Sequence, residues 1–128
     1  MINNKLGNYL FDVHAHIDMI EEKNIEKLLE KIREANIKKI ISCSTSFESN
    51  KKNLFLSKKY DEIECALGIY PLNIIELNEE EIDKAFNFLK KNISKAIAIG
   101  EIGLDFKYSK NKLEQEKQIK IFERFIEL

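Results

Sequence analysis

The sequence predicts an α/β domain in which a parallel β-sheet is covered by α-helices. Short apolar runs alternate four times with amphipathic helical patterns along the 128 residues. The four runs begin roughly 30 residues apart, which is a typical length for one strand–helix unit. Runs that are almost continuously apolar are typical of parallel strands buried on both faces. No linker or low-complexity segment separates the units, so residues 1–128 are expected to form a single domain.

The first unit is predicted to contain a strand at 9–14 followed by a helix. The apolar residues of that helix recur at intervals of three and four, the spacing that places side chains on one helical face. They are Ile25, Leu28, Leu29, Ile32 and Ala35. Asn24 is expected to cap the start of the helix, and Asn36 to end it. The second unit is predicted to have a strand at 39–43 and a helix over 48–60.

The third strand is predicted at 63–70 and is closed by Pro71, which cannot extend a strand ladder. The helix that follows has the clearest start in the chain, because Asn78 precedes three glutamates in a capping-box-like pattern. Its expected buried face comprises Ile82, Ala85, Phe86, Leu89 and Ile93. The fourth strand is predicted at 96–105. The last helix continues to Leu128 and carries Leu113, Ile119, Phe122, Phe125 and Ile126.

Composition excludes several classes of protein. With 44% hydrophobic residues, many of them isoleucine, the chain is not expected to be disordered, and it has no apolar stretch of ~20 residues to span a membrane. A net charge of −1 argues against capture of nucleic acid over the whole surface. Cys43 and Cys65 lie in apolar runs and are expected to be buried thiols. With no signal-like segment at the N-terminus, they indicate a cytoplasmic protein.

The two histidines of the chain lie in one tripeptide, at the end of the first predicted strand. Because residues i and i+2 of a strand point to the same face, His14 and His16 can converge on one metal ion. Carboxyl ends of parallel strands are also where α/β folds place active sites. Asp12 faces the same way, as a further ligand or as a partner that fixes an imidazole tautomer. The alternative is two polar side chains at a strand end with no metal.

Two further segments carry candidate residues. Glu101 follows an apolar strand between two glycines, and a carboxylate there is costly unless it is paired or binds a cation. It is expected at the same rim as the histidines, although Glu101 and Asp105 are also consistent with solvated acids at a strand end. Tyr70, at the end of the third strand, can donate its hydroxyl to a substrate oxygen. Alternatively, its ring packs and its hydroxyl stays hydrated.

Three stretches together resemble the TatD family of metal-dependent hydrolases. They are FDVHAHID at 11–18, ALGIYP at 66–71 and AIGEIGLDF at 98–106, in the family's order. The ending QEKQIKIFERFIEL, at 115–128, is similar to the helix that follows GEIGLD in that family. The resemblance implies a (β/α)₈ TIM-type barrel, of which four parallel βα units form the N-terminal half.

The resemblance also implies a set of roles. His14 and His16 would bind one divalent ion, and Glu101 would be the catalytic carboxylate that binds and bridges two ions of Mg²⁺, Mn²⁺ or Zn²⁺. Tyr70 would lie near the substrate, where the family commonly has histidine. Asp12 and Asp105 would support the site by hydrogen bonds. The implied reaction is metal-dependent hydrolysis of DNA phosphodiester bonds.

One departure from the family leaves three hypotheses. The family takes further histidines and an aspartate from later strands, but this chain has no third histidine. A closed barrel also needs eight units and about 250 residues. The chain is therefore the first half of a DNA-cleaving hydrolase, or a non-catalytic half-barrel completed by a partner or a second copy, or part of a hydrolase of C–N or ester bonds. We expect the chain alone to self-associate and to bind metal weakly.

Overall fold

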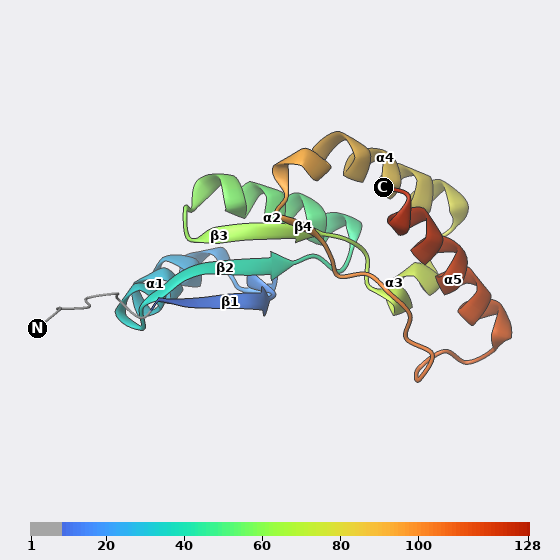
Figure 1. Cartoon of the computed structure of the whole chain (residues 1–128), viewed down its shortest axis with the longest axis horizontal. Coiled ribbons are helices and arrows are strands. Elements are labelled where there is room, and N and C mark those ends of the chain that lie inside the picture. The colour runs from blue at the N-terminus through green and yellow to red at the C-terminus, as the bar shows by residue number, and fades with distance from the viewer. Residues whose placement is uncertain (1–8) are drawn as a thin grey trace, which may run out of the picture.

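The computed structural model describes residues 9–128 and contains one parallel four-stranded sheet in the order β1-β2-β3-β4. Figure 1 shows the strands side by side and running in the same direction. They are β1 (Leu10–Ala15), β2 (Ile37–Cys43), β3 (Ile63–Leu67) and β4 (Ala98–Ile99). The predicted succession of parallel strand–helix units is confirmed.

Within residues 9–128, five α-helices and two 3₁₀ turns connect and cover the strands. The α-helices are α1 (Glu22–Glu34), α2 (Phe47–Lys59), α3 (Pro71–Glu76), α4 (Glu79–Asn92) and α5 (Lys112–Ile126). The 3₁₀ turns are η1 (Ile17–Met19), directly after β1, and η2 (Ile93–Lys95), directly after α4. Within residues 9–128, no helix combines the length and the apolar character needed to cross a membrane.

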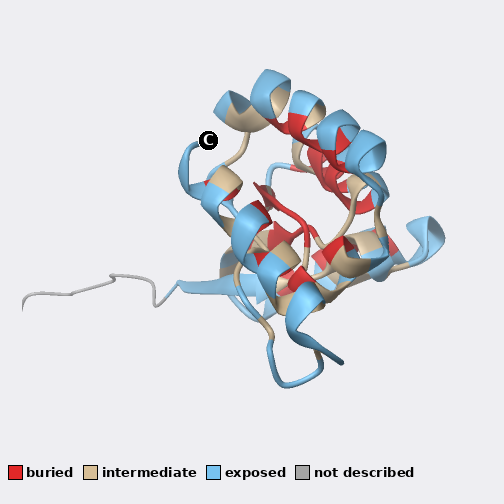
Figure 2. Ribbon diagram, turned by 90° about the vertical axis from the view of Figure 1, so that its right-hand side faces the viewer, coloured by how far each residue is buried: buried red, intermediate tan, exposed pale blue. Residues whose placement is uncertain are grey.

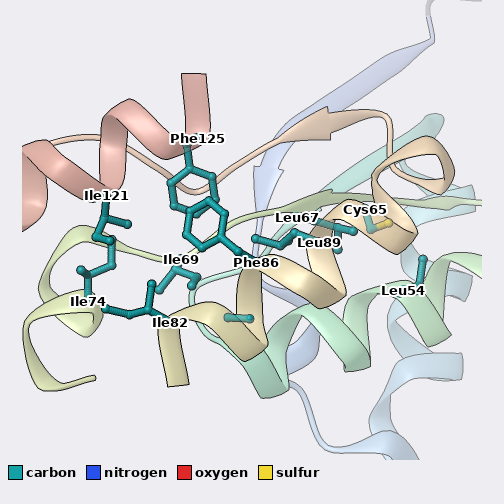
Figure 3. Packing of buried hydrophobic residues seen from close by; sticks show 11 residues of the cluster. Leu54, Cys65, Leu67, Ile69, Ile74, Ile82, Phe86, Leu89, Ile121 and Phe125 are labelled. Carbon is teal, nitrogen blue, oxygen red and sulfur yellow. The ribbon is translucent and has the colours of Figure 1, made fainter. Parts of the chain in front are cut away.

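Two buried clusters hold the helices against the sheet. The larger one joins β3 to α3, α4 and α5, and the rings of Phe86 and Phe125 lie 4.7 Å apart within it. Figure 3 shows this cluster, which includes Cys65, Leu67, Ile69, Ile74, Ile82, Leu89 and Ile121. The second cluster lies under α1 and contains Ile17, Ile25, Leu29, Ile32, Ile40, Leu56, Tyr60 and Ile63. Both cysteines are free and buried, as expected.

Several helix ends follow from the polar residues at their boundaries. Asn78 and Glu81 form both hydrogen bonds of a capping box at the start of α4, which confirms that prediction. Asn36 has a φ of 57°, a left-handed conformation that asparagine tolerates, and it ends α1 as expected. The start of α1 differs, because Glu21 rather than Asn24 is the N-cap residue.

Two strands are shorter than the apolar runs that predicted them. β3 ends at Leu67 rather than at residue 70. Pro71 begins α3, a short helix that was not predicted from the sequence. Pro fits there because the first turn of a helix has unpaired N–H groups in any case. β4 pairs with β3 only at Ala98 and Ile99 rather than over 96–105, because the following residues turn toward β2.

The outer elements leave much apolar surface open. In Figure 2 the buried residues lie between the helices and the centre of the sheet, whereas β1 is exposed. Phe11 and Val13 are 62% and 68% exposed. The predicted apolar face of α5 is only partly buried, because Phe125 is covered while Leu113, Ile119 and Ile126 are exposed. Ile93, expected on the buried face of α4, lies in η2 and is half-buried.

Candidate metal centre

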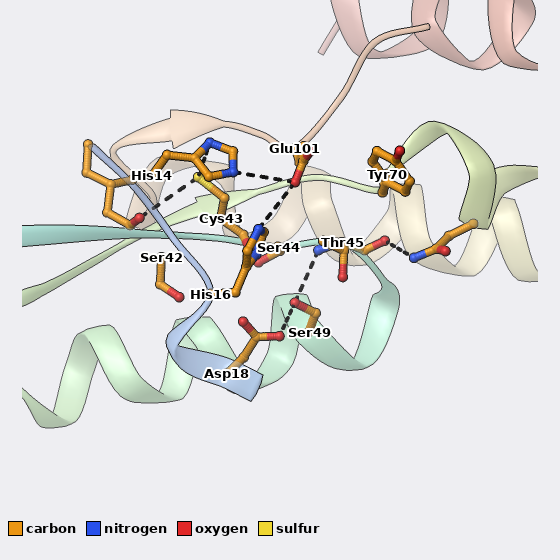
Figure 4. Close-up of polar contacts among 12 residues, drawn as sticks. His14, His16, Asp18, Ser42, Cys43, Ser44, Thr45, Ser49, Tyr70 and Glu101 are labelled. Carbon is orange, nitrogen blue, oxygen red and sulfur yellow. Dashed lines mark hydrogen bonds and ion pairs between the residues drawn. The ribbon is translucent and has the colours of Figure 1, made fainter. Parts of the chain in front are cut away.

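The side chains of His14, His16 and Glu101 meet at the carboxyl ends of the strands, as Figure 4 shows. Their ligand atoms all lie within 4.8 Å of one another. Glu101 Oε2 is 3.7 Å from His14 Nε2 and 3.6 Å from His16 Nε2. The His14 side chain is 55% exposed, whereas those of His16 and Glu101 are 29% and 28% exposed. The structure thus brings together the three residues that the sequence pattern selected as metal ligands.

Glu101 reaches the histidines because the chain crosses over the end of β3. The Glu101 N–H donates to the carbonyl of Ser44 at 2.8 Å, which ties the segment after β4 to the end of β2. This crossing depends on Gly68, since a Cβ atom there would lie 2.5 Å from the carbonyl carbon of Gly100 and 2.7 Å from Glu101 N. Only glycine therefore fits at position 68 while Glu101 keeps this place.

A buried polar face of α2 holds the strand ends in register, and the sequence reading did not find it. Asn53 accepts a hydrogen bond from the Ser42 hydroxyl at 2.7 Å and donates one to the Ser44 hydroxyl at 3.0 Å. Asn50 brackets Gly68, accepting from its N–H and donating to its carbonyl. The sequence does carry a signal for this polar face, because residues 48–60 include asparagines at positions where an amphipathic helix would place apolar residues.

The same helix also supports the turn that follows His16. The Ser49 hydroxyl donates to Asp18 Oδ2 at 2.7 Å, and Ile17 N–H donates to the Ser42 hydroxyl at 2.9 Å. Asp18 Oδ1 is buried without a partner among the residues that the structure describes. The η1 turn is thereby fixed to both β2 and α2, directly beside the second histidine.

Cys43 contacts both imidazoles from the end of β2. Its carbonyl oxygen lies 2.8 Å from His16 Nδ1, and its Sγ lies 3.7 Å from His14 Nδ1. Burial raises the pKa of the Cys43 thiol above its usual value, and the nearby Glu101 carboxylate adds to the effect. Asp12, predicted as a ligand or as a tautomer-fixing partner, instead accepts a hydrogen bond from the backbone N–H of His14.

Tyr70 and Asp105 form a second polar pair at the edge of the site. The Tyr70 hydroxyl donates to Asp105 Oδ2 at 2.6 Å, and this hydrogen bond raises the pKa of Tyr70 to about 12. The Asp105 backbone is in turn held by buried Gln118, whose Oε1 accepts from the Asp105 N–H at 2.8 Å. Asp105 thus contacts the site through the Tyr70 hydroxyl.

An open pocket of about 380 Å³ adjoins these groups. It is lined by His16, Met19, Thr45, Tyr70, Asn73 and Glu101. The ring of Tyr70 therefore lies where a bound substrate would contact it, next to two of the candidate metal ligands. Thr45 adds a hydroxyl, and Asn73 donates through Nδ2 to the Thr45 carbonyl.

The donor set fits a divalent cation. Imidazole nitrogen and carboxylate oxygen are ligands of Zn²⁺, Mn²⁺ and related ions. The N–O separations of 3.6 and 3.7 Å are too long for hydrogen bonds. They suit two donors that each lie about 2.0–2.2 Å from a shared ion. The Nδ1 contacts of both rings leave the Nε2 atoms to face Glu101, as metal binding through Nε2 requires.

Comparison with protein families decides the relationship. The model of the family described as "TatD related DNase" matches residues 11–128. The chain belongs to the TatD family. A solved structure of the TatD homologue YjjV from Escherichia coli superposes with a TM-score of 0.69 at 25% identity, over 91% of this chain and 48% of that one. A hydrolase of the TatD family from Entamoeba histolytica gives a TM-score of 0.74 at 24% identity, which supports the fold.

Curated relatives are named as metal-dependent hydrolases or deoxyribonucleases. An uncharacterized metal-dependent hydrolase of Methanocaldococcus jannaschii is 32% identical over an alignment 118 positions long, which covers 91% of this chain and 45% of that protein. Human deoxyribonuclease TATDN3 is 25% identical over an alignment 133 positions long, which covers 95% of this chain and 48% of that protein. The chain thus spans about half the length of these relatives, and its four parallel strands form the N-terminal half of a TatD-type barrel.

Proposed function

We propose that this chain supplies the first half of the metal centre of a hydrolase that cleaves phosphodiester bonds in DNA. The observation that carries the proposal is the convergence of His14, His16 and Glu101 beside the open pocket. Membership of a metal-dependent hydrolase family supports hydrolysis, and a relative named a deoxyribonuclease supports DNA as the substrate. The two carboxylate oxygens of Glu101 suit it to bridge two ions.

Each residue has a defined task in this proposal. His14, His16 and Glu101 hold the cation, which, when bound, lowers the pKa of a coordinated water and offsets charge on a phosphoryl oxygen. Tyr70 forms one wall of the pocket. Because its hydroxyl already donates a hydrogen bond to Asp105, it positions substrate through its ring and its oxygen lone pairs. Thr45 offers a hydroxyl that can donate to a phosphate oxygen.

A second candidate function follows from the number of ligands. Among the residues that the structure describes, His14, His16 and Glu101 form the candidate cluster, and the chain has no further histidine. Three ligands and an exposed β1 favour a half-barrel that becomes active only when a partner or a second copy completes the site. Hydrolysis of C–N or ester bonds stays a further possibility, because metal ligands are shared across such enzymes and substrate loops decide.

The test combines metal titration with hydrolysis of three substrate classes. Calorimetric titration with Mn²⁺ or Zn²⁺ should show weak binding to the chain, which is lost in a His14→Ala/His16→Ala variant. With excess metal, phosphodiester model substrates and short DNA should be cleaved in preference to amides and esters, and a chelator should abolish cleavage. Preferred cleavage of amides or esters contradicts the proposal, whereas metal binding without any cleavage supports the half-barrel alternative.

A further inference from the structure

Cys43 occupies a position from which one residue can set the proton positions of both candidate ligand histidines. It ends β2, is only 6% exposed, and contacts the imidazole of His14 in β1 and that of His16 directly after β1. Its thiol is not among the clustered ligand atoms of His14, His16 and Glu101. The sequence pattern assigned it to the apolar core, so its contact with the site is a finding of the structure.

The hydrogen bond between Cys43 and His16 can run in only one direction. The Cys43 carbonyl oxygen can only accept a hydrogen bond, so the His16 Nδ1 at 2.8 Å carries the proton. In the neutral ring this leaves the lone pair on Nε2, the atom that faces Glu101 Oε2 at 3.6 Å. The backbone of residue 43 therefore presents His16 in the tautomer that metal binding through Nε2 needs.

The contact with His14, made by the Cys43 side chain, favours the same tautomer, with the proton on Nδ1. Cys43 Sγ lies 3.7 Å from His14 Nδ1 and 3.9 Å from the carbonyl of Ile41. The Ile41 carbonyl can only accept, so with the thiol proton donated to it the sulfur is free to accept from the Nδ1–H of His14. His14 Nε2 then also carries a lone pair and faces Glu101 at 3.7 Å.

We propose that Cys43 is a positioning residue that holds both histidines as Nδ1–H tautomers, His16 through its carbonyl and His14 through its sulfur. The inference rests on the proposed role of the two histidines as metal ligands. A substitution at Cys43 can separate the two contacts, because it removes the sulfur and leaves the backbone carbonyl in place. A change at Cys43 should therefore affect His14 and spare His16.

Ring-nitrogen NMR of the metal-free chain tests the proposal directly, because the chain has only two histidines. With ¹⁵N-labelled imidazoles, long-range ¹H–¹⁵N spectra at neutral pH should show a proton on Nδ1 in both rings of the wild type. Cys43→Ala should shift His14 toward a mixture of tautomers and leave His16 unchanged, and Cys43→Ser should restore His14 in part. Cys65→Ala, at the other buried cysteine, is the matched control and should change neither ring.

Metal affinity provides the second readout. Outer hydrogen-bond partners of ligand histidines are worth 10–100-fold in metal affinity, and a thiol is a weak acceptor, so Cys43→Ala should weaken Zn²⁺ binding by about 10-fold. Cys43→Ser should recover part of that loss, and Cys65→Ala should bind Zn²⁺ as the wild type does. A Co²⁺ complex of the wild type should lack the charge-transfer absorption of a bound thiolate.

Three results would overturn the proposal: a His14 proton on Nε2 in the wild type, a His14 tautomer that ignores Cys43→Ala, or a thiolate–Co²⁺ band showing that Cys43 is itself a ligand. Failure of the proposed function looks different. In that case the wild type binds no Zn²⁺, while the ring-nitrogen spectra still report whether Cys43 sets the two tautomers.

Discussion

At the scale of single residues, the site combines groups with opposite requirements for their protons. The histidines need a free Nε2 lone pair to bind a cation, whereas Tyr70 is held in its protonated form by Asp105. The sequence could identify His14, His16 and Glu101, because ligand-type residues at strand ends are visible as a pattern. It could not identify Cys43, whose role depends on which strand ends lie next to each other. Asn53 was detectable only as an asparagine at a helix position where an apolar residue is expected, and its partners Ser42 and Ser44 were not.

Tyr70 should make the stability of the chain depend on pH in the alkaline range. Its pKa is raised from 10.0 to about 12 in the folded chain, first by the hydrogen bond to Asp105, so the folded state binds the phenolic proton more tightly than the unfolded state. The stabilisation is therefore complete below about pH 10 and is lost as the pH rises through about 12.

Urea unfolding at a series of pH values measures this effect. The free energy of unfolding of Tyr70→Phe should fall less steeply between pH 10 and 12 than that of the wild type. Phenolate absorbance should show one of the four tyrosines titrating late, and Asp105→Asn should return it toward its ordinary range. Parallel stability curves for wild type and Tyr70→Phe would show that the pair does not hold the proton.

At the scale of elements, the site is formed by residues at the ends of strands and not by residues in the middle of strands. The sequence predicted the order, direction and approximate starts of all four strands, because the apolar runs are long and well separated. It overestimated β3 and β4, because an apolar run does not reveal where hydrogen-bond partners change. Ser44 takes over the pairing of Glu101, and Thr45 accepts from the Tyr70 N–H, so both strands stop early.

Gly68 is the point at which the crossing of elements can be tested. In Gly68→Ala the new methyl group would meet the backbone of Gly100 and Glu101 at 2.5–2.7 Å, and backbone cannot move there without moving Glu101. We expect a loss of about 1–3 kcal/mol of stability, typical of overpacking, and a clear loss of Mn²⁺ or Zn²⁺ affinity.

A destabilising change elsewhere separates the two effects of Gly68→Ala. Ile82→Val, in the buried face of α4, should cost about 0.5–1.5 kcal/mol and leave metal affinity unchanged. Denaturant unfolding gives the stabilities, and calorimetric titration gives the affinities. Equal losses of affinity in both variants would mean that metal binding follows global stability and not the position of Glu101.

At the scale of the whole molecule, burial is uneven across the sheet. The residues of β3 are almost all buried, whereas residues 10–14 of β1 are exposed. The chain spans 45–48% of the length of its relatives, and its sheet has the parallel order of half a barrel. The apolar side chains of β1 are therefore those that a second half-barrel would cover, and within residues 9–128 no strand pairs with the outer edge of β1.

We therefore expect the 128-residue chain to dimerise or aggregate in solution, because an unpaired strand with apolar side chains favours pairing with another copy. Size-exclusion chromatography with light scattering should give a mass above that of a single 15.0 kDa chain. Phe11→Lys, at a side chain 62% exposed on β1, should lower that mass by adding charge to the unpaired strand.

Phe55→Lys, at a ring 55% exposed on α2, is the matched control and should leave the mass unchanged, because α2 already packs against β3. A soluble wild-type monomer, or an equal effect of both lysine variants, would show that β1 does not drive association.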